Sequence, residues 1–274
     1  MKISGKTRIT GIFGYPVEHT LSPLMHNAAF SHLGLDLCYL PFCVHPDSLG
    51  SAVESIRALG LAGVNVTIPH KENVLMFLDE TDPEAASIGA VNTIVNSNGR
   101  LSGHNTDGRG FMRSLEDEGI TVSGRRVLII GAGGSAKAIG YHLAKEAGGL
   151  FIFNRNAERA EMLAGHLSGR NKVETVSSLE SIRDYDIVIN STPLGLRPDD
   201  PPPFDSDMLR PEQVVCDLIY SETALIAKAR TRGCRTVSGL GMLLWQGVLA
   251  FRLWTGIEPP AEIMRTALLS AKKQ

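Results

Sequence analysis

The chain is poor in cysteine, and its charges nearly cancel. The cysteines fit no CxxC spacing and stand in or beside apolar runs, so the sequence predicts neither a metal site nor a redox-active pair. We expect buried thiols in a reducing cytoplasm. A formal net charge of −2 gives no reason to expect a nucleic-acid or anionic-membrane partner. The cysteines are Cys38, Cys43, Cys216 and Cys234.

Long apolar runs are also absent. The most apolar stretch, residues 240–254, is short for a membrane span and is interrupted by Gln246 and Arg252. The first residues lack the apolar segment of a secretory signal. We therefore expect a cytoplasmic protein with no membrane partner. A hydrophobic content of 43% in 274 residues is typical of one or two globular domains.

A glycine-rich turn in the middle of the chain is the clearest motif. Residues 126–130 predict a buried strand, the turn Gly131-Ala-Gly-Gly-Ser-Ala136 follows, and a helix at 137–147 and a strand at 150–153 come next. This is a βαβ unit with the dinucleotide fingerprint G-x-G-x-x-A. The first glycine allows the tight turn, the second lets a pyrophosphate approach, and the alanine lets the helix pack closely on the strand.

The end of the second strand of this unit predicts which dinucleotide binds. An NAD site usually has a carboxylate there, for the ribose 2′-hydroxyl. This chain has Asn154 and Arg155 instead, with Arg159 one helical turn further on. A guanidinium binds a 2′-phosphate, so we expect NADP as the cofactor.

Strands and helices alternate in the rest of the chain, which predicts an α/β fold with mainly parallel sheets. Ser22 is the predicted N-cap of the first helix, with Pro23 at its first position. Because the fingerprint begins so late, we expect a substrate-binding domain of residues 1–106 plus 240–274, a Rossmann-type domain of residues 107–239, and a cleft between them. The other predicted strands are 8–13, 36–44, 63–68, 90–95, 186–190, 214–220 and 235–237; the predicted helices are 22–33, 47–59, 69–78, 108–118 and a long one after Gly241.

Polar residues gather at strand ends in the first half of the chain. Asn65 and Thr67 alternate along one strand, Lys71 follows it, Asn92 interrupts another strand, and Asp107 stands at the domain boundary. Each alone is also compatible with a structural role. Together with the hydroxyls of Thr20 and Ser22, they predict a pocket for a small hydroxylated acid. Gln246, in a helix that is apolar on nearly every face, is a buried amide that needs partners from a ligand or from the backbone.

The chain resembles the shikimate dehydrogenase family over nearly its whole length. The resemblance rests on nine segments in the family's order: Gly14-Tyr-Pro-Val-Glu-His-Thr-Leu-Ser-Pro23, Asn65-Val-Thr-Ile-Pro-His-Lys71, Gly89-Ala-Val-Asn-Thr93, Gly103-His-Asn-Thr-Asp-Gly108, Gly131-Ala-Gly-Gly-Ser-Ala136, Asn154-Arg155 with Arg159, Asn190-Ser-Thr-Pro-Leu-Gly195, Asp217-Leu-Ile-Tyr220 and Gly241-Met-Leu-Leu-Trp-Gln246.

The resemblance implies a reversible, NADP-dependent reduction of 3-dehydroshikimate to shikimate, a step of aromatic amino-acid biosynthesis. Carried over by position, Lys71 and Asp107 are the catalytic pair. The implied substrate-binding residues are Thr20, Ser22, Asn65, Thr67, Asn92, Tyr220 and Gln246. The implied cofactor-binding residues are Gly131, Ala132, Gly133, Gly134, Ser135, Ala136, Asn154, Arg155, Arg159, Thr192 and Gly239.

Three departures from the family's pattern keep alternatives open. Thr20 stands where serine is usual, which leaves the choice between shikimate and the bulkier quinate undecided. Asn156 replaces a frequent threonine, and the segment after Tyr220 is short and lacks the usual proline. A quinate/shikimate dehydrogenase is the first alternative, and a non-catalytic NADP-binding sensor is a distant one. The protonation state of Lys71 and the formation of a homodimer are also undecided.

Overall fold

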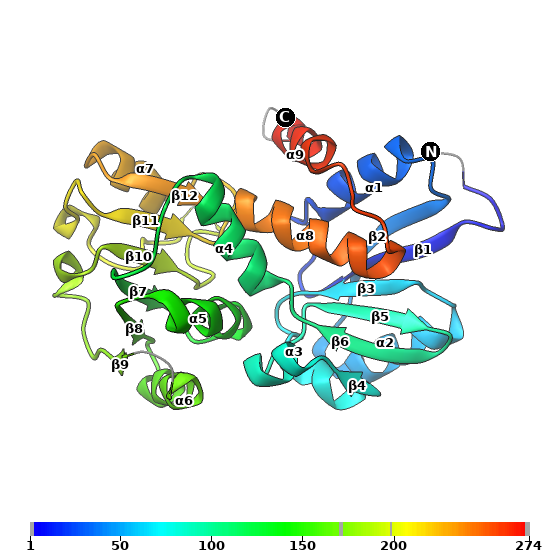
Figure 1. The fold of residues 1–274 in the computed structure, drawn as a ribbon, viewed down its shortest axis with the longest axis horizontal. Coiled ribbons are helices and arrows are strands. Elements are labelled where there is room, and N and C mark those ends of the chain that lie inside the picture. The colour runs from blue at the N-terminus through cyan, green and yellow to red at the C-terminus, as the bar shows by residue number, and fades with distance from the viewer. Residues whose placement is uncertain (1–2, 170–171, 198, 272–274) are drawn as a thin grey trace. The chain divides into compact units, whose positions relative to one another are not determined.

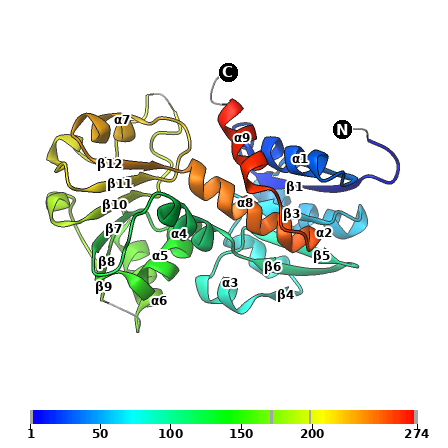
Figure 2. The ribbon, with the colours of Figure 1, turned by 45° about the horizontal axis from the view of Figure 1, so that its top comes forward.

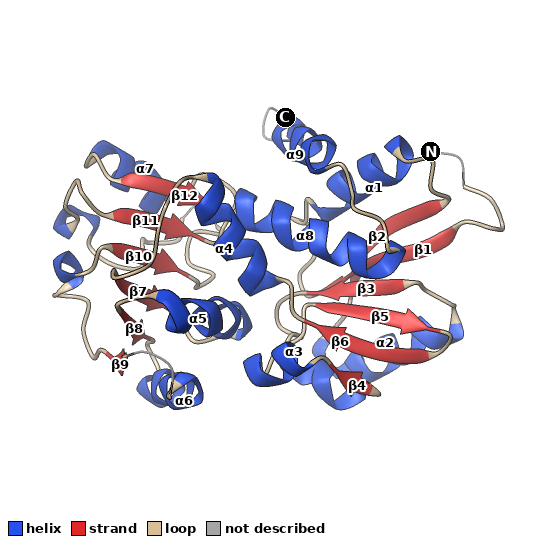
Figure 3. Ribbon diagram, viewed as in Figure 1, coloured by secondary structure: helices blue, strands red, loops and turns tan. Residues whose placement is uncertain are grey.

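A computed structural model describes residues 3–169, 172–197 and 199–271 (Figure 1). The chain divides into two compact units. Unit 1 comprises Met1–Asp107 and Leu244–Gln274, and unit 2 comprises Gly108–Leu243. Both units combine helices with a sheet (Figure 3). The α/β class is therefore confirmed, while the functions assigned to the two domains and the cleft between them stay predictions.

Unit 1 has a mixed sheet with the strand order β2-β1-β3-β5-β6-β4. The pairs β1–β2, β1–β3 and β4–β6 are parallel, whereas β3–β5 and β5–β6 are antiparallel. Helices α1 and α9 lie side by side (Figure 2). The strands are β1 (Arg8–Gly14), β2 (Leu37–Cys43), β3 (Gly63–Val66), β4 (Glu80–Thr81), β5 (Thr93–Ser97) and β6 (Arg100–His104); the helices are α1 (Ser22–His32), α2 (Leu49–Ala58), α3 (Pro83–Ile88), α8 (Leu240–Thr255), which enters from unit 2, and α9 (Ala261–Ala271).

One predicted strand of unit 1 is displaced along the chain. The sequence predicted a strand at 90–95, but β5 begins at Thr93. The preceding amides are used elsewhere, because Val91 N donates to Lys71 O and Asn92 N donates to His104 O. The tight turn at Asn98 and Gly99, both with positive φ, then returns the chain as β6, which the sequence did not predict.

The helix predicted at 69–78 is wrong. Only a short 3-10 segment, η2 (Asn73–Phe77), forms there. In an α-helix the Lys71 carbonyl would accept from the amide four residues later. Here it accepts from Val91 N at 2.8 Å instead, which ties the segment that carries Lys71 to the start of β5.

Unit 2 has a fully parallel sheet with the order β12-β11-β10-β7-β8-β9. Numbered within the unit, this is the doubly wound order of dinucleotide-binding folds. The strands are β7 (Arg126–Ile130), β8 (Gly149–Phe153), β9 (Val173–Thr175), β10 (Ile187–Asn190), β11 (Val214–Asp217) and β12 (Arg235–Ser238); the helices are α4 (Asp107–Asp117), α5 (Gly134–Glu146), α6 (Ala157–Leu167) and α7 (Ala224–Thr231).

Successive side chains of β7 point to opposite faces of the sheet, and both faces are buried. Val127 and Ile129 pack into one hydrophobic cluster, with Leu143 of α5, while Leu128 and Ile130 pack into a second cluster. Such two-sided burial explains the unbroken apolar run that predicted this strand. None of the helices in the described ranges is long and apolar enough to cross a membrane.

Candidate active site

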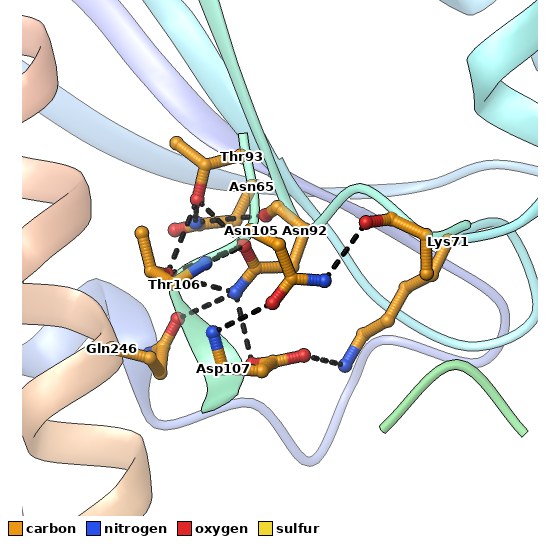
Figure 4. Close-up of polar contacts among 9 residues, drawn as sticks. Asn65, Lys71, Asn92, Thr93, Asn105, Thr106, Asp107 and Gln246 are labelled. Atoms are coloured by element: carbon orange, nitrogen blue, oxygen red, sulfur yellow. Dashed lines mark hydrogen bonds and ion pairs between the residues drawn. The ribbon is translucent and has the colours of Figure 1, made fainter. Parts of the chain in front are cut away.

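Lys71 and Asp107 form a largely buried ion pair in unit 1. Lys71 Nζ donates to Asp107 Oδ2 at 2.6 Å, and the two side chains are 12% and 6% exposed (Figure 4). Asp107 is the first residue of α4, where the positive end of the helix dipole favours a carboxylate. Its amide donates to Asn105 Oδ1 at 3.0 Å, and Asn105 in turn donates to Ala90 O. Asp107 is therefore fixed in two ways, by the hydrogen bond of its backbone amide to Asn105 and by the contacts of its carboxylate oxygens.

Asn92 is the centre of the polar cluster. Its amide nitrogen lies 2.9 Å from Asp107 Oδ1, 2.9 Å from Thr106 Oγ1 and 3.5 Å from Gln246 Oε1. Its amide oxygen accepts from Thr106 N and from Thr93 Oγ1. Asn92 therefore fixes the second oxygen of Asp107 while Lys71 takes the first, and so it orients the carboxylate in the pair (Figure 4).

Asn65 of β3 extends this network deeper into unit 1. Its amide nitrogen donates to Asn92 O at 3.1 Å and to Thr93 Oγ1 at 3.0 Å. The hydroxyl of Tyr39, a fully buried residue of β2, donates to Asn65 Oδ1 at 2.8 Å. Burial raises the pKa of Tyr39, which keeps its hydroxyl protonated and available as that donor.

Ser22 has a different environment from the one that the sequence predicted. The N-cap of α1 is Leu21, and Ser22 is the first helical residue, so its predicted capping role is wrong. The amide of Ser22 donates to Thr20 Oγ1 at 3.3 Å. The Ser22 side chain instead lies close enough to Tyr39 to act against the burial that raises the pKa of that phenol, which places Ser22 beside the Asn65 network.

Thr67, just beyond β3, lies against the segment that leads to these hydroxyls. A Cβ built at Gly14 would meet Thr67 Cγ2 at 2.5 Å, so the close approach requires glycine there. Tyr15 N also donates to Ile68 O at 3.0 Å. These contacts hold the start of the Thr20 loop beside the end of β3.

Gln246 lies on α8 and is 8% exposed, as its apolar helix predicted. Its side-chain oxygen accepts from Asn92 at 3.5 Å. The structure therefore places eight of the predicted catalytic and substrate-binding residues in unit 1. Direct side-chain hydrogen bonds and the contact from Asn65 to the Asn92 backbone join five of them in one network around Asn92: Lys71, Asp107, Asn92, Asn65 and Gln246.

The glycine-rich turn of unit 2 has the geometry that a pyrophosphate site needs. Gly131 has φ +116°, and a Cβ there would meet Ser191 Oγ at 2.5 Å, so this position requires glycine. Gly133 is the N-cap of α5, and a Cβ there would meet no atom of the chain within 4 Å. Ala136 is fully buried against the sheet. The N-terminus of α5 therefore has its positive dipole end beside open backbone, which fits a bound dinucleotide.

The predicted 2′-phosphate residues follow β8 directly. Gly131 N donates to Phe153 O at 2.8 Å, so the end of β8 lies next to the turn. Asn156 caps α6 by accepting from Arg159 N at 3.2 Å, and Asn154 Nδ2 donates to Asn156 O. Arg155 is exposed at this end of the sheet. Asn156, which stands where the family frequently has threonine, therefore acts as the N-cap of α6.

Two loops at the carboxyl end of the same sheet are joined by Asn190 and Asp217. Asn190 Oδ1 accepts from Thr192 Oγ1 at 2.7 Å, and Asn190 Nδ2 donates to Asp217 Oδ1 at 3.1 Å. Asp217 also accepts from Ile219 N and from Thr223 Oγ1. Burial raises the pKa of Asp217, and these hydrogen bonds oppose that rise.

The hydrogen bond between Asn190 and Asp217 helps to position Thr192 and Tyr220, which the sequence predicted as cofactor- and substrate-binding residues. Thr192 stands directly after Asn190, and Tyr220 follows the loop that Asp217 holds; burial raises the pKa of Tyr220. Gly239 N donates to Ile219 O, and a Cβ at Gly239 would meet Leu218 O at 2.1 Å, so this contact requires glycine.

The sequence interpretation gave no role to the residues that hold the predicted ones in place. Their signal was present as polar residues within or directly after apolar strands, but it did not reveal which partner each one finds. They are Tyr39, Asn105, Thr106, Asn190 and Asp217.

Comparison with known proteins covers nearly all of the chain. The shikimate dehydrogenase substrate-binding domain matches residues 12–94, the shikimate/quinate 5-dehydrogenase domain matches 114–194, and the shikimate 5′-dehydrogenase C-terminal domain matches 239–269. A shikimate dehydrogenase (NADP+) of Desulforamulus reducens is 48% identical over 282 aligned residues, covering 97% of this chain and 96% of the relative.

Two solved structures have the same fold. Shikimate dehydrogenase from Aquifex aeolicus is 39% identical with a TM-score of 0.92, covering 97% of this chain and 99% of that one. Shikimate 5-dehydrogenase from Thermus thermophilus, in complex with NADP(H) and shikimate, is 36% identical with a TM-score of 0.88, covering 96% and 99%. The chain belongs to the shikimate dehydrogenase family.

Proposed function

We propose that this protein is an NADP-dependent shikimate dehydrogenase, which reversibly reduces 3-dehydroshikimate to shikimate. The observation that carries the proposal is the buried pair of Lys71 and Asp107, set in a network of amides and hydroxyls. Its family membership and the turn at Gly131–Ala136 support the same reaction. The proposed substrate is a small polyhydroxylated ring acid, which such a polar site suits better than an apolar ligand.

Lys71 is the proposed proton donor and acceptor. Reduction of a ketone leaves negative charge on its oxygen, and an ammonium beside that oxygen stabilises the charge and then donates a proton. In the oxidation direction the neutral amine accepts the proton of the hydroxyl. When bound, NADPH supplies the hydride that the reduction requires.

Asp107 orients the lysine and has capacity left for the substrate. A carboxylate has about four lone-pair positions. Lys71 uses one on Oδ2 and Asn92 uses one on Oδ1, so each oxygen can still accept from a substrate hydroxyl. Asn92 acts mainly by fixing Asp107, because its own amide hydrogens already point at Thr106 and Asp107. Thr20, Ser22, Asn65, Thr67, Gln246 and Tyr220 are the proposed substrate contacts.

The cofactor is proposed to bind at the turn of unit 2. Gly131–Ala136 and the N-terminus of α5 would hold the pyrophosphate, and Asn154, Arg155 and Arg159 would hold the 2′-phosphate. Thr192 and Gly239 belong to neighbouring loops at the same carboxyl end of the sheet. The guanidinium groups favour NADP because they pair with a phosphate that NAD does not have.

Absorbance of the reduced cofactor tests the proposal directly. The purified chain is assayed with each pairing of shikimate or quinate with NADP or NAD. We expect the highest kcat/KM with shikimate and NADP, and a selective rise of KM for NADP in Arg155→Ala. No turnover with any pairing would leave only the sensor interpretation, and turnover limited to quinate would replace the proposed substrate. A cytoplasmic location and a homodimer stay predictions.

A further inference from the structure

A second cationic feature of unit 2 lies away from the glycine-rich turn. A surface pocket of about 470 Å³ is lined by Arg126, Arg183, Asp184 and Arg210, and we call it the arginine pocket. Three arginines and one aspartate line it, so the lining residues carry a formal charge of +2. The proposed reaction uses none of these residues.

The arginine pocket lies at the amino ends of the strands. Arg126 is the first residue of β7, whereas Gly131 directly follows the last residue of the same strand. Arg210 precedes β11 and Asp184 precedes β10, so both lie in the segments that lead into the amino ends of these strands. At about 3.3 Å per residue, the length of β7 separates the two features by roughly 15 Å. An anion in the arginine pocket would therefore not compete with the dinucleotide.

Each arginine is held by contacts that leave its charge available. The Arg126 guanidinium lies 4.7 Å from the centroid of the Phe151 ring and 5.6 Å from that of Tyr185. Arg183 Nε donates to Met208 O at 2.9 Å, which leaves its two terminal nitrogens for another partner. Within the described part of the chain, no carboxylate oxygen lies within 4.0 Å of a guanidinium nitrogen of Arg126, Arg183 or Arg210.

Arg210 gives an independent sign of a missing partner. Its amide donates to Gln213 Oε1 at 2.7 Å, and its carbonyl accepts from Cys234 Sγ, so its backbone is fixed at the pocket. Its Nε is buried and has no hydrogen-bond partner among the described residues. A buried donor without an acceptor costs free energy, and attraction between the Arg210 charge and an anion in the pocket would offset that cost.

We propose that the arginine pocket binds a phosphate group, as orthophosphate or as a small phosphomonoester. Planar guanidinium forks match the oxygen spacing of phosphate and bind it in bidentate fashion. Three such forks suit a dianion. The Asp184 carboxylate accepts from a protonated phosphate oxygen or from a hydroxyl beside the phosphate. The pocket is thus an anion-binding site on unit 2, separate from the proposed substrate and cofactor sites.

Calorimetric titration of the full-length protein tests this proposal. NADP is kept saturating so that its own site is filled, and ionic strength is held constant with chloride. Inorganic phosphate and glycerol 3-phosphate are titrated separately into the wild type, Arg183→Gln, Arg210→Gln and the control Arg230→Gln. Arg230 is an exposed arginine of the same unit that pairs with Glu222 outside the pocket.

We expect saturable binding to the wild type and to Arg230→Gln, and an affinity at least tenfold weaker in Arg183→Gln and Arg210→Gln. Tighter binding of glycerol 3-phosphate would identify the ligand as a phosphomonoester, and equal binding would identify it as free phosphate. Absence of saturable binding to the wild type, or equal binding by Arg183→Gln, overturns the proposal. Because Arg183 is exposed, its substitution keeps the test decisive if Arg210→Gln fails to fold.

Discussion

We predict that the buried side chain of His26, in α1, makes the free energy of unfolding fall steeply in acid. The side chain is fully buried, stacked on Tyr39 with ring centroids 4.5 Å apart and an interplanar angle of 9°. Phe251 and Trp254 surround the same ring. Both ring nitrogens lack hydrogen-bond partners among the described residues, and burial lowers the pKa of His26 to about 3. The folded protein therefore keeps His26 neutral at a pH where the unfolded chain protonates it.

The size of this effect follows from the two pKa values. The unfolded pKa is 6.5 and the folded pKa is about 3, so unfolding takes up a proton anywhere between them. Stability that is fully present above pH 6.5 is lost as the pH falls towards 3, by about 1.4 kcal/mol per pH unit. Between pH 8 and pH 5 the loss from His26 alone is about 2 kcal/mol.

Urea unfolding of the wild type and His26→Phe at pH 8 and pH 5 measures this loss. Both tryptophans, Trp245 and Trp254, belong to unit 1, so tryptophan fluorescence reports the unit that contains His26. Phenylalanine keeps a stacked ring but does not titrate. We expect the wild type to lose about 2 kcal/mol more than His26→Phe on acidification. Equal losses in the two proteins would show that protonation of His26 does not oppose folding in acid.

Three further substitutions test other parts of the structure. Gly133→Val fills open space at the N-terminus of α5, so KM for NADP should rise at least tenfold with an unchanged melting temperature. Asp217→Ala leaves the donors of Asn190, Ile219 and Thr223 without their acceptor and should cost about 2–4 kcal/mol in urea unfolding followed by circular dichroism. Thr20→Ser removes a methyl group and should raise kcat/KM for quinate relative to shikimate; an unchanged ratio would exclude the methyl group as a determinant of substrate choice.

Elements with strong local constraints could be predicted from the sequence. The strand Arg126–Ile130 was predicted to the residue, because the four apolar residues after Arg126 end at a glycine that needs positive φ. The helix after the turn begins at Gly134, three residues earlier than predicted. The helix at 69–78 and the strand at 90–95 were misjudged for one shared reason. Lys71 O and Val91 N bond to each other across the chain, and a local pattern has no access to such a contact.

In the candidate active site, too, the sequence indicated the residues but not their long-range contacts. Residue types at strand ends indicated Lys71, Asp107 and Asn92, but the sequence did not reveal that Asn92 turns its amide towards Asp107. Ser22 was read as a helix cap because serine before proline is typical of one. Its side chain lies beside Tyr39 instead, a residue of β2 that is distant in sequence.

The most direct test of the account is the turnover of Lys71→Met at saturating shikimate and NADP. Methionine has nearly the same length but carries no charge and no transferable proton. We predict that kcat falls by about 10²- to 10⁴-fold, while NADP still binds with the affinity of the wild type. A kcat within threefold of the wild type, in a variant that is folded and binds NADP, would contradict the assignment of Lys71 as the proton donor and acceptor.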